Sequence, residues 1–144
     1  MQPDADPAGA GREPRSSGLA GRLASFRYAG RGLRELVASQ PNARIHAAAT
    51  LGAGLLALAL GLSPLEWCAL ALAIGLVWLA EALNTALELL CDLASREPHP
   101  LVARAKDVAA GGVLAAALAA ALVGLLLFAP KLAGTFLAIL RFGG

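Results

Sequence analysis

Apolar residues fill most of the chain after residue 44 and are interrupted at only a few turn-forming positions. A helix that crosses the hydrocarbon core of a membrane needs about 20 mostly apolar residues. Ser63-Pro64 and the Arg-Glu-Pro-His-Pro run at 96–100 divide the apolar region into segments of about this length. Pro130 and Lys131 mark the expected exit of the last segment, and the short apolar tail 132–144 is expected at the membrane surface. The pattern therefore predicts an all-α membrane protein with three transmembrane helices, at about 45–62, 65–93 and 101–129.

A basic amphipathic segment precedes the first predicted span. Between residues 19 and 39, apolar-face positions recur three or four residues apart and predict a helix: Leu19, Leu23, Phe26, Gly30, Leu33 and Val37. Arg27, Arg31 and Arg34 share another face, so this helix is expected in the membrane interface near anionic headgroups. A soluble helix that binds a partner is the alternative. Gln40-Pro41 ends the segment, because proline disfavours helical geometry at the residue before it.

Composition and charge agree with a membrane fold and orient it. The chain is 58% hydrophobic and 15% charged, whereas soluble domains are about 45–50% apolar and about 25% charged. Residues 1–18 have no signal-peptide core and are expected to be a disordered tail before a membrane domain at 19–144. Seven of the twelve basic residues precede residue 45, and the turn at 61–66 has none. The positive-inside rule therefore predicts a cytoplasmic N-terminus and second loop. The net charge of +2 by itself says little about partners, and no nucleic-acid partner is expected.

An acidic stripe in the second predicted span is the main candidate for chemistry. Glu81, Asn84, Glu88 and Asp92 are spaced to share one helix face, with Thr85 beside them. An ionisable group inside a membrane costs on the order of several kcal/mol unless it is paired or hydrated. The stripe is therefore expected to form a site. Contacts between helices of neighbouring subunits and a proton or ion relay are the alternatives.

Three charged residues stand where the third span enters the membrane: Arg104, Lys106 and Asp107. Cations near a carboxylate cluster can hold phosphate oxygens while the carboxylates hold Mg²⁺. For Arg104 and Lys106 alone, ordinary positive flanking of a span is the simpler interpretation. The chain contains no GxxxxGK[ST], HRD, DFG or GxGxxG motif. The residues by themselves thus indicate an acidic intramembrane site with a basic rim at the cytoplasmic face, and they leave the reaction open.

The order of these residues resembles the prokaryotic diacylglycerol kinase family. Glu81-Ala-Leu-Asn84-Thr85-Ala-Leu-Glu88 is similar to the family signature E-x-x-N-[ST]-A-[IL]-E. Asp92 with Arg104-Ala-Lys106-Asp107 is similar to the element that follows this signature. Upstream, Asn42-x-Arg44-Ile45-His46 is more typical of the undecaprenol kinase branch than of the diacylglycerol branch. The resemblance extends over roughly residues 25–124.

This resemblance implies a lipid kinase of the bacterial cytoplasmic membrane, a homotrimer that transfers the γ-phosphate of MgATP to a lipid hydroxyl. Undecaprenol and diacylglycerol compete as substrates, with undecaprenyl phosphate or phosphatidic acid as product, and the upstream motif favours a polyprenol. Glu81 is implied as the catalytic base and, with Asn84, as a lipid-binding residue. Glu88 is implied as a Mg²⁺ ligand. The implied nucleotide-site residues are Asn84, Arg104, Lys106 and Asp107. A non-enzymatic small membrane protein or an ion relay is the alternative.

Two further features bear on this hypothesis. The family often has Glu two positions before Asn42 as an implied second metal ligand, and this chain has Gln40 there. Glutamine keeps an oxygen ligand but removes its charge, so Mg²⁺ is expected to be held less tightly. The third span also carries small residues four apart that favour close helix packing in an oligomer: Gly112, Ala116, Ala120 and Gly124.

Overall fold

The computed structural model describes residues 19–95 and 97–142, and these residues form helices and turns without a strand. The all-α prediction is therefore confirmed for the described part of the chain. The predicted tail at residues 1–18 lies outside it. Four helices follow one another: α1 (Leu19–Ser39), α2 (Pro41–Ala59), α3 (Pro64–Ala94) and α4 (Pro100–Phe142). The chain divides into two compact units between Glu35 and Leu36, and each is described by itself.

Helix α1 has the bounds that its apolar periodicity predicts. Its large apolar side chains, Leu23 and Phe26 among them, are exposed within its own unit. The guanidinium groups of Arg31 and Arg27 lie 4.7 and 5.9 Å from the ring centre of Tyr28. A cation over an aromatic face is stabilised by the ring quadrupole. Helix α1 thus presents an uncovered apolar surface together with a cationic cluster, as a helix in a membrane interface would.

The joint between α1 and α2 is shaped by Pro41 and by Arg44. Gln40 is extended, with φ −104° and ψ 118°, and Pro41 opens α2 at a position where no backbone donor is needed. Nε and Nη2 of Arg44 donate hydrogen bonds of 3.0 and 2.5 Å to the carbonyl oxygens of Val37 and Ala38. The last carbonyls of a helix have no partner inside it. Arg44 therefore satisfies the end of α1 from the first turn of α2.

A tight turn connects α2 to α3. Gly61 has a positive φ of 62°, which a glycine adopts without steric cost. The N–H groups of Gly61 and Leu62 donate to the carbonyls of Leu58 and Ala57, at 3.3 and 3.2 Å, the pattern of a Schellman ending. Ser63 then caps α3: its hydroxyl accepts from the Glu66 N–H, and its own N–H donates to the Glu66 carboxylate at 2.6 Å. The polar ends of both helices are thereby satisfied within a few residues.

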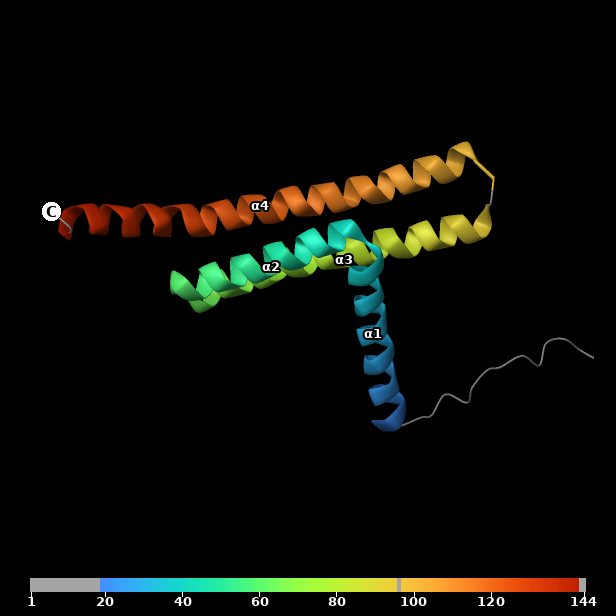
Figure 1. Ribbon diagram of the computed structural model, residues 1–144, viewed down its shortest axis with the longest axis horizontal. Coiled ribbons are helices and arrows are strands. Elements are labelled where there is room, and N and C mark those ends of the chain that lie inside the picture. Colours follow the sequence, from blue (N-terminus) through green and yellow to red (C-terminus); the bar gives the residue numbers. More distant parts are fainter. Residues whose placement is uncertain (1–18, 96, 143–144) are drawn as a thin grey trace, which may run out of the picture. The chain divides into compact units, whose positions relative to one another are not determined.

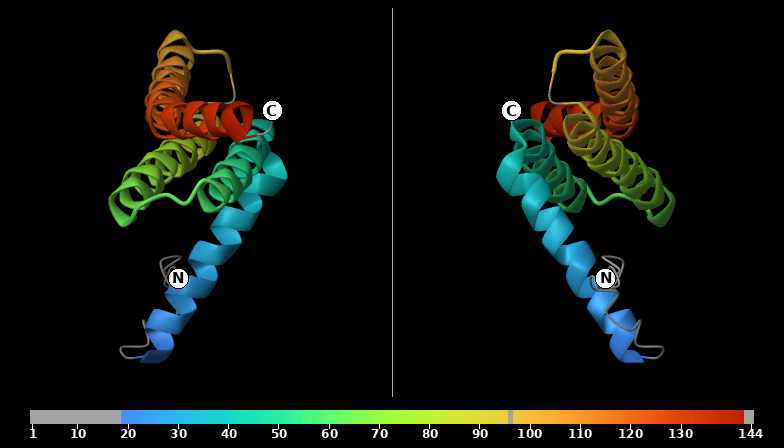
Figure 2. Two further views of the ribbon diagram at one scale, coloured as in Figure 1. Left: turned by 90° about the vertical axis from the view of Figure 1, so that its left-hand side faces the viewer. Right: turned by 90° about the vertical axis from the view of Figure 1, so that its right-hand side faces the viewer.

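Helices α2, α3 and α4 run alongside one another in alternating directions (Figure 1), and the end-on views in Figure 2 show them as three neighbouring rods. A small core at the α2–α3 turn contains Ala57, Leu62 and Leu70, with Leu127 and Phe128 of α4 packed against it. Most other leucines on these helices are exposed, including Leu72 at 76% and Leu118 at 62%. Such a surface is unfavourable in water and suits lipid.

Two of the described helices, α3 and α4, are long and apolar enough to cross a membrane. Helix α2 is shorter, with 19 residues, and its first turn is polar because it contains Asn42 and Arg44. It lies beside α3 and is joined to it by a short turn. This arrangement is compatible with the crossing predicted at 45–62, which stays a prediction.

Helix α4 continues beyond the exit expected at Pro130. It extends to Phe142 without a break, so its 43 residues measure about 64 Å at 1.5 Å per residue, against about 30 Å of hydrocarbon core. Pro130 removes a single backbone donor, a loss that long apolar helices tolerate. The Lys131 ammonium also lies 3.2 Å from the Glu66 carboxylate and ties this part of α4 to the start of α3. The residues after 131 thus extend the helix rather than lying as a separate tail.

Candidate active site

The acidic stripe of α3 is turned toward the other helices of its unit. Glu81 is 1% exposed and is the largest fully buried side chain among the described residues. Asn84 is 8% exposed, Glu88 is partly buried, and Asp92 is exposed. The side chains thus pass from buried to exposed along the helix toward the α3–α4 loop. The predicted common face exists, and only its inner half is enclosed.

A pocket of about 270 Å³ lies over Glu81, Asn84 and Glu88. Helix α2 contributes Asn42, Ile45 and His46 to its lining, and α4 contributes Ala110, Val113, Leu114 and Ala117. The α4 wall is apolar, and the polar groups come from α2 and α3. The pocket therefore joins polar residues of two helices against an apolar third helix.

Several oxygens in this region have no partner. The Asn84 amide donates from Nδ2 to Oε1 of Glu88 at 3.0 Å, which orients both side chains. Oε2 of Glu81, Oδ1 of Asn84 and Oγ1 of Thr85 are buried without a hydrogen bond among the described residues. Buried polar atoms are nearly always satisfied in native proteins. These oxygens can accept a hydrogen bond from a substrate hydroxyl or coordinate a hard cation.

The basic residues predicted for the rim lie outside this pocket. Nζ of Lys106 donates a hydrogen bond of 2.5 Å to Oδ1 of Asp92, across the α3–α4 loop. Arg104 and Asp107 are exposed on the first turns of α4. The structure therefore brings Lys106 to the acidic stripe, at its outermost member. It leaves Arg104 and Asp107 at the surface, without a contact to Glu81 or Glu88.

This arrangement can be compared with known proteins. The sequence profile described as prokaryotic diacylglycerol kinase matches residues 27–128. The chain belongs to this family. It is 42% identical to the undecaprenol kinase of Bacillus subtilis (strain 168) over 108 residues, which are 75% of this chain and 88% of that protein. It is 44% identical to a diacylglycerol kinase of Synechocystis over 111 residues, 76% of this chain and 63% of the relative. The resemblance of the sequence motifs is thus confirmed, and the chain is a membrane lipid kinase.

The oxygens of the kinase pocket suit Mg²⁺ only with help from another ligand. Among the described residues, no group of three or more His, Cys, Asp or Glu side chains is gathered closely enough to hold a metal. Mg²⁺ is commonly held by one or two carboxylates together with water and substrate phosphates. Glu88 and the free oxygens of Glu81 and Asn84 fit this partial role. Gln40, half-buried at the head of α2, does not line the pocket.

Sequence reasoning did not assign a site role to His46 or Asn42. Both line the pocket of the kinase, and Asn42, His46, Ala49 and Ala53 are spaced to lie on one face of α2. This spacing was available as a signal, but only the packing of α2 shows which of its faces meets Glu81. A second contact was also missed: Nε1 of Trp78 donates to Oγ1 of Thr50 at 3.1 Å and joins α3 to α2.

Proposed function

We propose that this kinase transfers the γ-phosphoryl group of MgATP to the hydroxyl of a membrane lipid alcohol, with Glu81 as the general base. The observation that carries the proposal is a carboxylate that is 1% exposed and whose Oε2 has no partner among the described residues, in a pocket with an apolar wall on α4. A buried acceptor of this kind is suited to a hydroxyl that arrives from the lipid phase. That ATP is the phosphoryl donor and that Mg²⁺ is the metal is part of the proposal.

The chemistry balances with groups of this chain. The substrate hydroxyl donates its proton to Oε2 of Glu81 while its oxygen bonds to the γ-phosphorus, and the bond to the bridging oxygen breaks as ADP leaves. The hydrogen bond from Asn84 orients Glu88, which lines the same pocket about two helical turns from Glu81. Mg²⁺, when bound, offsets negative charge on the transferring phosphoryl group. Glu88 is the proposed ligand, with Gln40 as an outer, uncharged one.

We assign the nucleotide phosphates to the α3–α4 loop side of the pocket, near Lys106. Its ammonium group pairs with Asp92, and both side chains are accessible, at 36% and 65% exposure. An exposed ion pair contributes about 0–1 kcal/mol, so it is readily exchanged for a phosphate. Arg104 and Asp107, on the same exposed turns of α4, complete the proposed nucleotide site.

The charge pattern supports a proposed orientation of the chain in the membrane. Basic residues concentrate in α1 and near the α3–α4 loop, whereas the α2–α3 turn itself contains none, and Lys131 of α4 pairs with Glu66 beside it. The proposed topology therefore has the N-terminus, the pocket mouth and the α3–α4 loop in the cytoplasm of a bacterium. Cytoplasmic ATP then meets the exposed end of the acidic stripe.

A homotrimer is the proposed assembly, and the outer face of α3 supports an oligomer. Exposed leucines are spaced three, four or seven residues apart along this face: Leu72, Leu76, Leu79, Leu83 and Leu90. This is the spacing of helices that pack lengthwise against one another. The small-residue stripe of α4 has another use, because Ala116 is buried and Gly124 lines a cavity inside the same chain. The partner-facing residues are thus sought on α3 first.

The test is transfer of radiolabel from ATP to lipid by the full chain in detergent micelles, with undecaprenol and diacylglycerol side by side. Label in either lipid that depends on Glu81 supports the proposal. One of the two relatives is named as an undecaprenol kinase and the other as a diacylglycerol kinase, so their names support either lipid. The upstream motif favours the polyprenol. A tenfold higher kcat/KM for diacylglycerol would overturn that preference and leave the kinase activity in place.

A further inference from the structure

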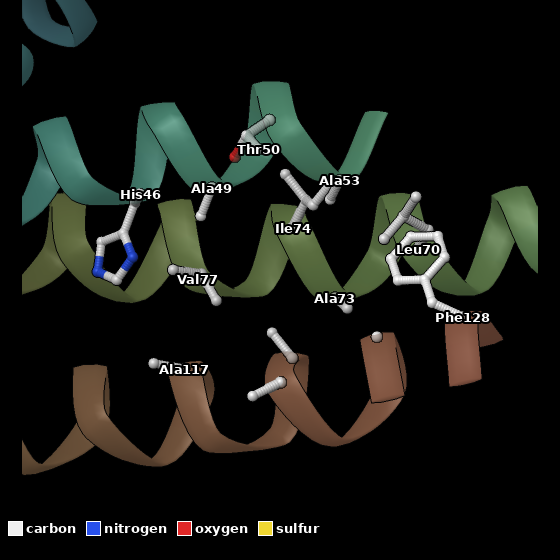
Figure 3. A pocket seen from close by; sticks show the side chains of 13 residues that line it. His46, Ala49, Thr50, Ala53, Leu70, Ala73, Ile74, Val77, Ala117 and Phe128 are labelled. Carbon is white, nitrogen blue, oxygen red and sulfur yellow. The ribbon is translucent and has the colours of Figure 1, made fainter. Parts of the chain in front are cut away.

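A second cavity adjoins the active-site pocket. It has a volume of about 340 Å³ and lies between α2, α3 and α4. His46 and Ala117 line both cavities. Figure 3 shows His46 at one end of the second cavity and Phe128 at the other. We call this cavity the apolar groove. It leads away from the polar pocket toward the α2–α3 turn.

The groove is narrow at its sides and closed at its far end. Its side walls consist mainly of small residues, among them Ala49, Ala53, Ala73, Ala120, Ala121 and Gly124. At the far end, Leu70 and Phe128 belong to the packed core at the α2–α3 turn. Leu70 and Phe128 form a floor at that end, whereas Ile74 and Val77 of α3 lie along the length of the groove. Its opposite end meets the pocket that contains Glu81.

Two polar contacts outside the acidic stripe hold the walls in position. The hydrogen bond from Trp78 to Thr50 joins α3 to α2 beside the groove, which Thr50 itself lines. The bond satisfies the indole N–H of Trp78, and the Thr50 hydroxyl serves as its acceptor. The ion pair of Lys131 with Glu66 joins α4 to α3 beyond the floor. The helices that line the groove are thus linked to one another by side-chain contacts.

The dimensions suit one hydrocarbon chain. From Ala117 to Phe128, α4 rises about 16 Å, and from His46 to Ala53, α2 rises about 10 Å. The volume lies at the lower end of the range of about 300–1,000 Å³ for small-molecule sites. A polyprenol carries its hydroxyl at the end of a single chain. Diacylglycerol carries two acyl chains, one on each of the two glycerol carbons that lack the hydroxyl, and the groove has room for one of them.

We propose that the apolar groove holds the first isoprene units of a single-chain lipid alcohol, with the hydroxyl at His46 and Glu81. The hydroxyl then satisfies the free Oε2 of Glu81, and the half-buried imidazole of His46 positions it at the junction of the two cavities. The remainder of a long chain leaves the groove sideways into the bilayer. This inference rests on the proposed lipid kinase function and specifies its acceptor.

Substitutions that fill the groove test the proposal. Ala120→Leu adds bulk to the groove wall, and Ala119→Leu is the matched control, because Ala119 is exposed on the same helix and lines neither cavity. Overpacking a site is unfavourable, so Ala120→Leu should lower kcat/KM for undecaprenol about tenfold or more. The KM for ATP should stay unchanged. The kcat/KM for prenol, which has a single isoprene unit, should fall little in Ala120→Leu, because this short chain would end near Ala117. Ala53→Leu narrows the groove from α2 and should repeat the effect if Ala120→Leu fails to assemble.

Photo-crosslinking reports the groove independently of catalysis. A geranylgeraniol with a diazirine at its far end is added to the Glu81→Gln protein in micelles, and the labelled peptides are identified by mass spectrometry. Label near Leu70 and Phe128 in the Glu81→Gln protein, and its loss when Ala120→Leu is added to that protein, would support lipid binding in the groove. Label spread over exposed leucines, or undecaprenol turnover unaffected by Ala120→Leu, overturns it. Equal competition by diacylglycerol for the label overturns the single-chain assignment. Absence of any lipid phosphorylation by the unmodified chain would instead remove the proposed function, and the crosslinks would still decide the groove.

Discussion

Replacement of Glu81 by glutamine separates a catalytic carboxylate from a structural one. The two side chains are almost identical in shape, and Glu81 is 1% exposed, with no partner for Oε2 in the described part of the chain. The substitution therefore removes proton-accepting capacity and charge while leaving the packing of α3 intact. If Glu81 is the general base, turnover should fall and the fold should persist.

A catalytic role and a structural role of Glu81 predict different effects of the substitution on turnover and on stability. A positioned general base contributes about 10²–10⁴-fold to the rate, which corresponds to about 3–5 kcal/mol of transition-state stabilisation. Stability should be unchanged or slightly higher, because an ionised carboxylate without a partner is unfavourable inside a membrane protein whereas an amide is neutral. A residue that stabilises the helix bundle would instead lose stability on substitution and keep most of its turnover.

The assay is radiolabel transfer from ATP at saturating lipid, paired with thermal unfolding of the same samples in detergent. Glu97→Gln is the matched control, since Glu97 is exposed in the α3–α4 loop and the change in chemistry is the same. Near-normal kcat in Glu81→Gln, or a loss of kcat matched by Glu97→Gln, would refute the assignment of the base.

Four further outcomes are expected. Gln40→Glu should lower the Mg²⁺ concentration at half-maximal rate, because added ligand charge tightens a hard cation; an unchanged Mg²⁺ titration would remove Gln40 from the metal site. Asp92→Asn should lower the KM for ATP about two- to fivefold by releasing Lys106, and a raised KM would show that Asp92 itself serves the nucleotide. Ser63→Cys, in a background without other cysteines, should react with an impermeant reagent only from outside the cell, and labelling only from the cytoplasm would reverse the topology. Glu66→Gln should lower the unfolding temperature slightly, through loss of the Lys131 pair and of the carboxylate charge in the capping box, which an amide can still form, while kcat in micelles stays within about twofold; a large loss of kcat would mean that the far end of the groove affects the chemistry.

The local features of this protein were predictable from the sequence. Periodicity of apolar residues predicted α1 with its observed bounds, and Gln40-Pro41 and Ser63-Pro64 predicted the breaks on either side of α2. The spacing of Glu81, Asn84 and Glu88 predicted one shared face. These features depend on residues within a few turns of each other, where helix geometry alone relates sequence distance to direction in space. The family motif is also a local pattern of residues, so it predicted the reaction class from the sequence.

What faces that stripe was decided only by the tertiary structure. The sequence contains His46 and Asn42 in a motif, but nothing local shows that α2 turns them toward Glu81. Likewise, spacing could not show that Lys106 pairs with Asp92. Nor could it show that alanines of three helices leave a groove between them. Such contacts join residues far apart in the chain, and they depend on how each helix is rotated and how closely it approaches its neighbours. Rotation and approach result from the packing of all the side chains together.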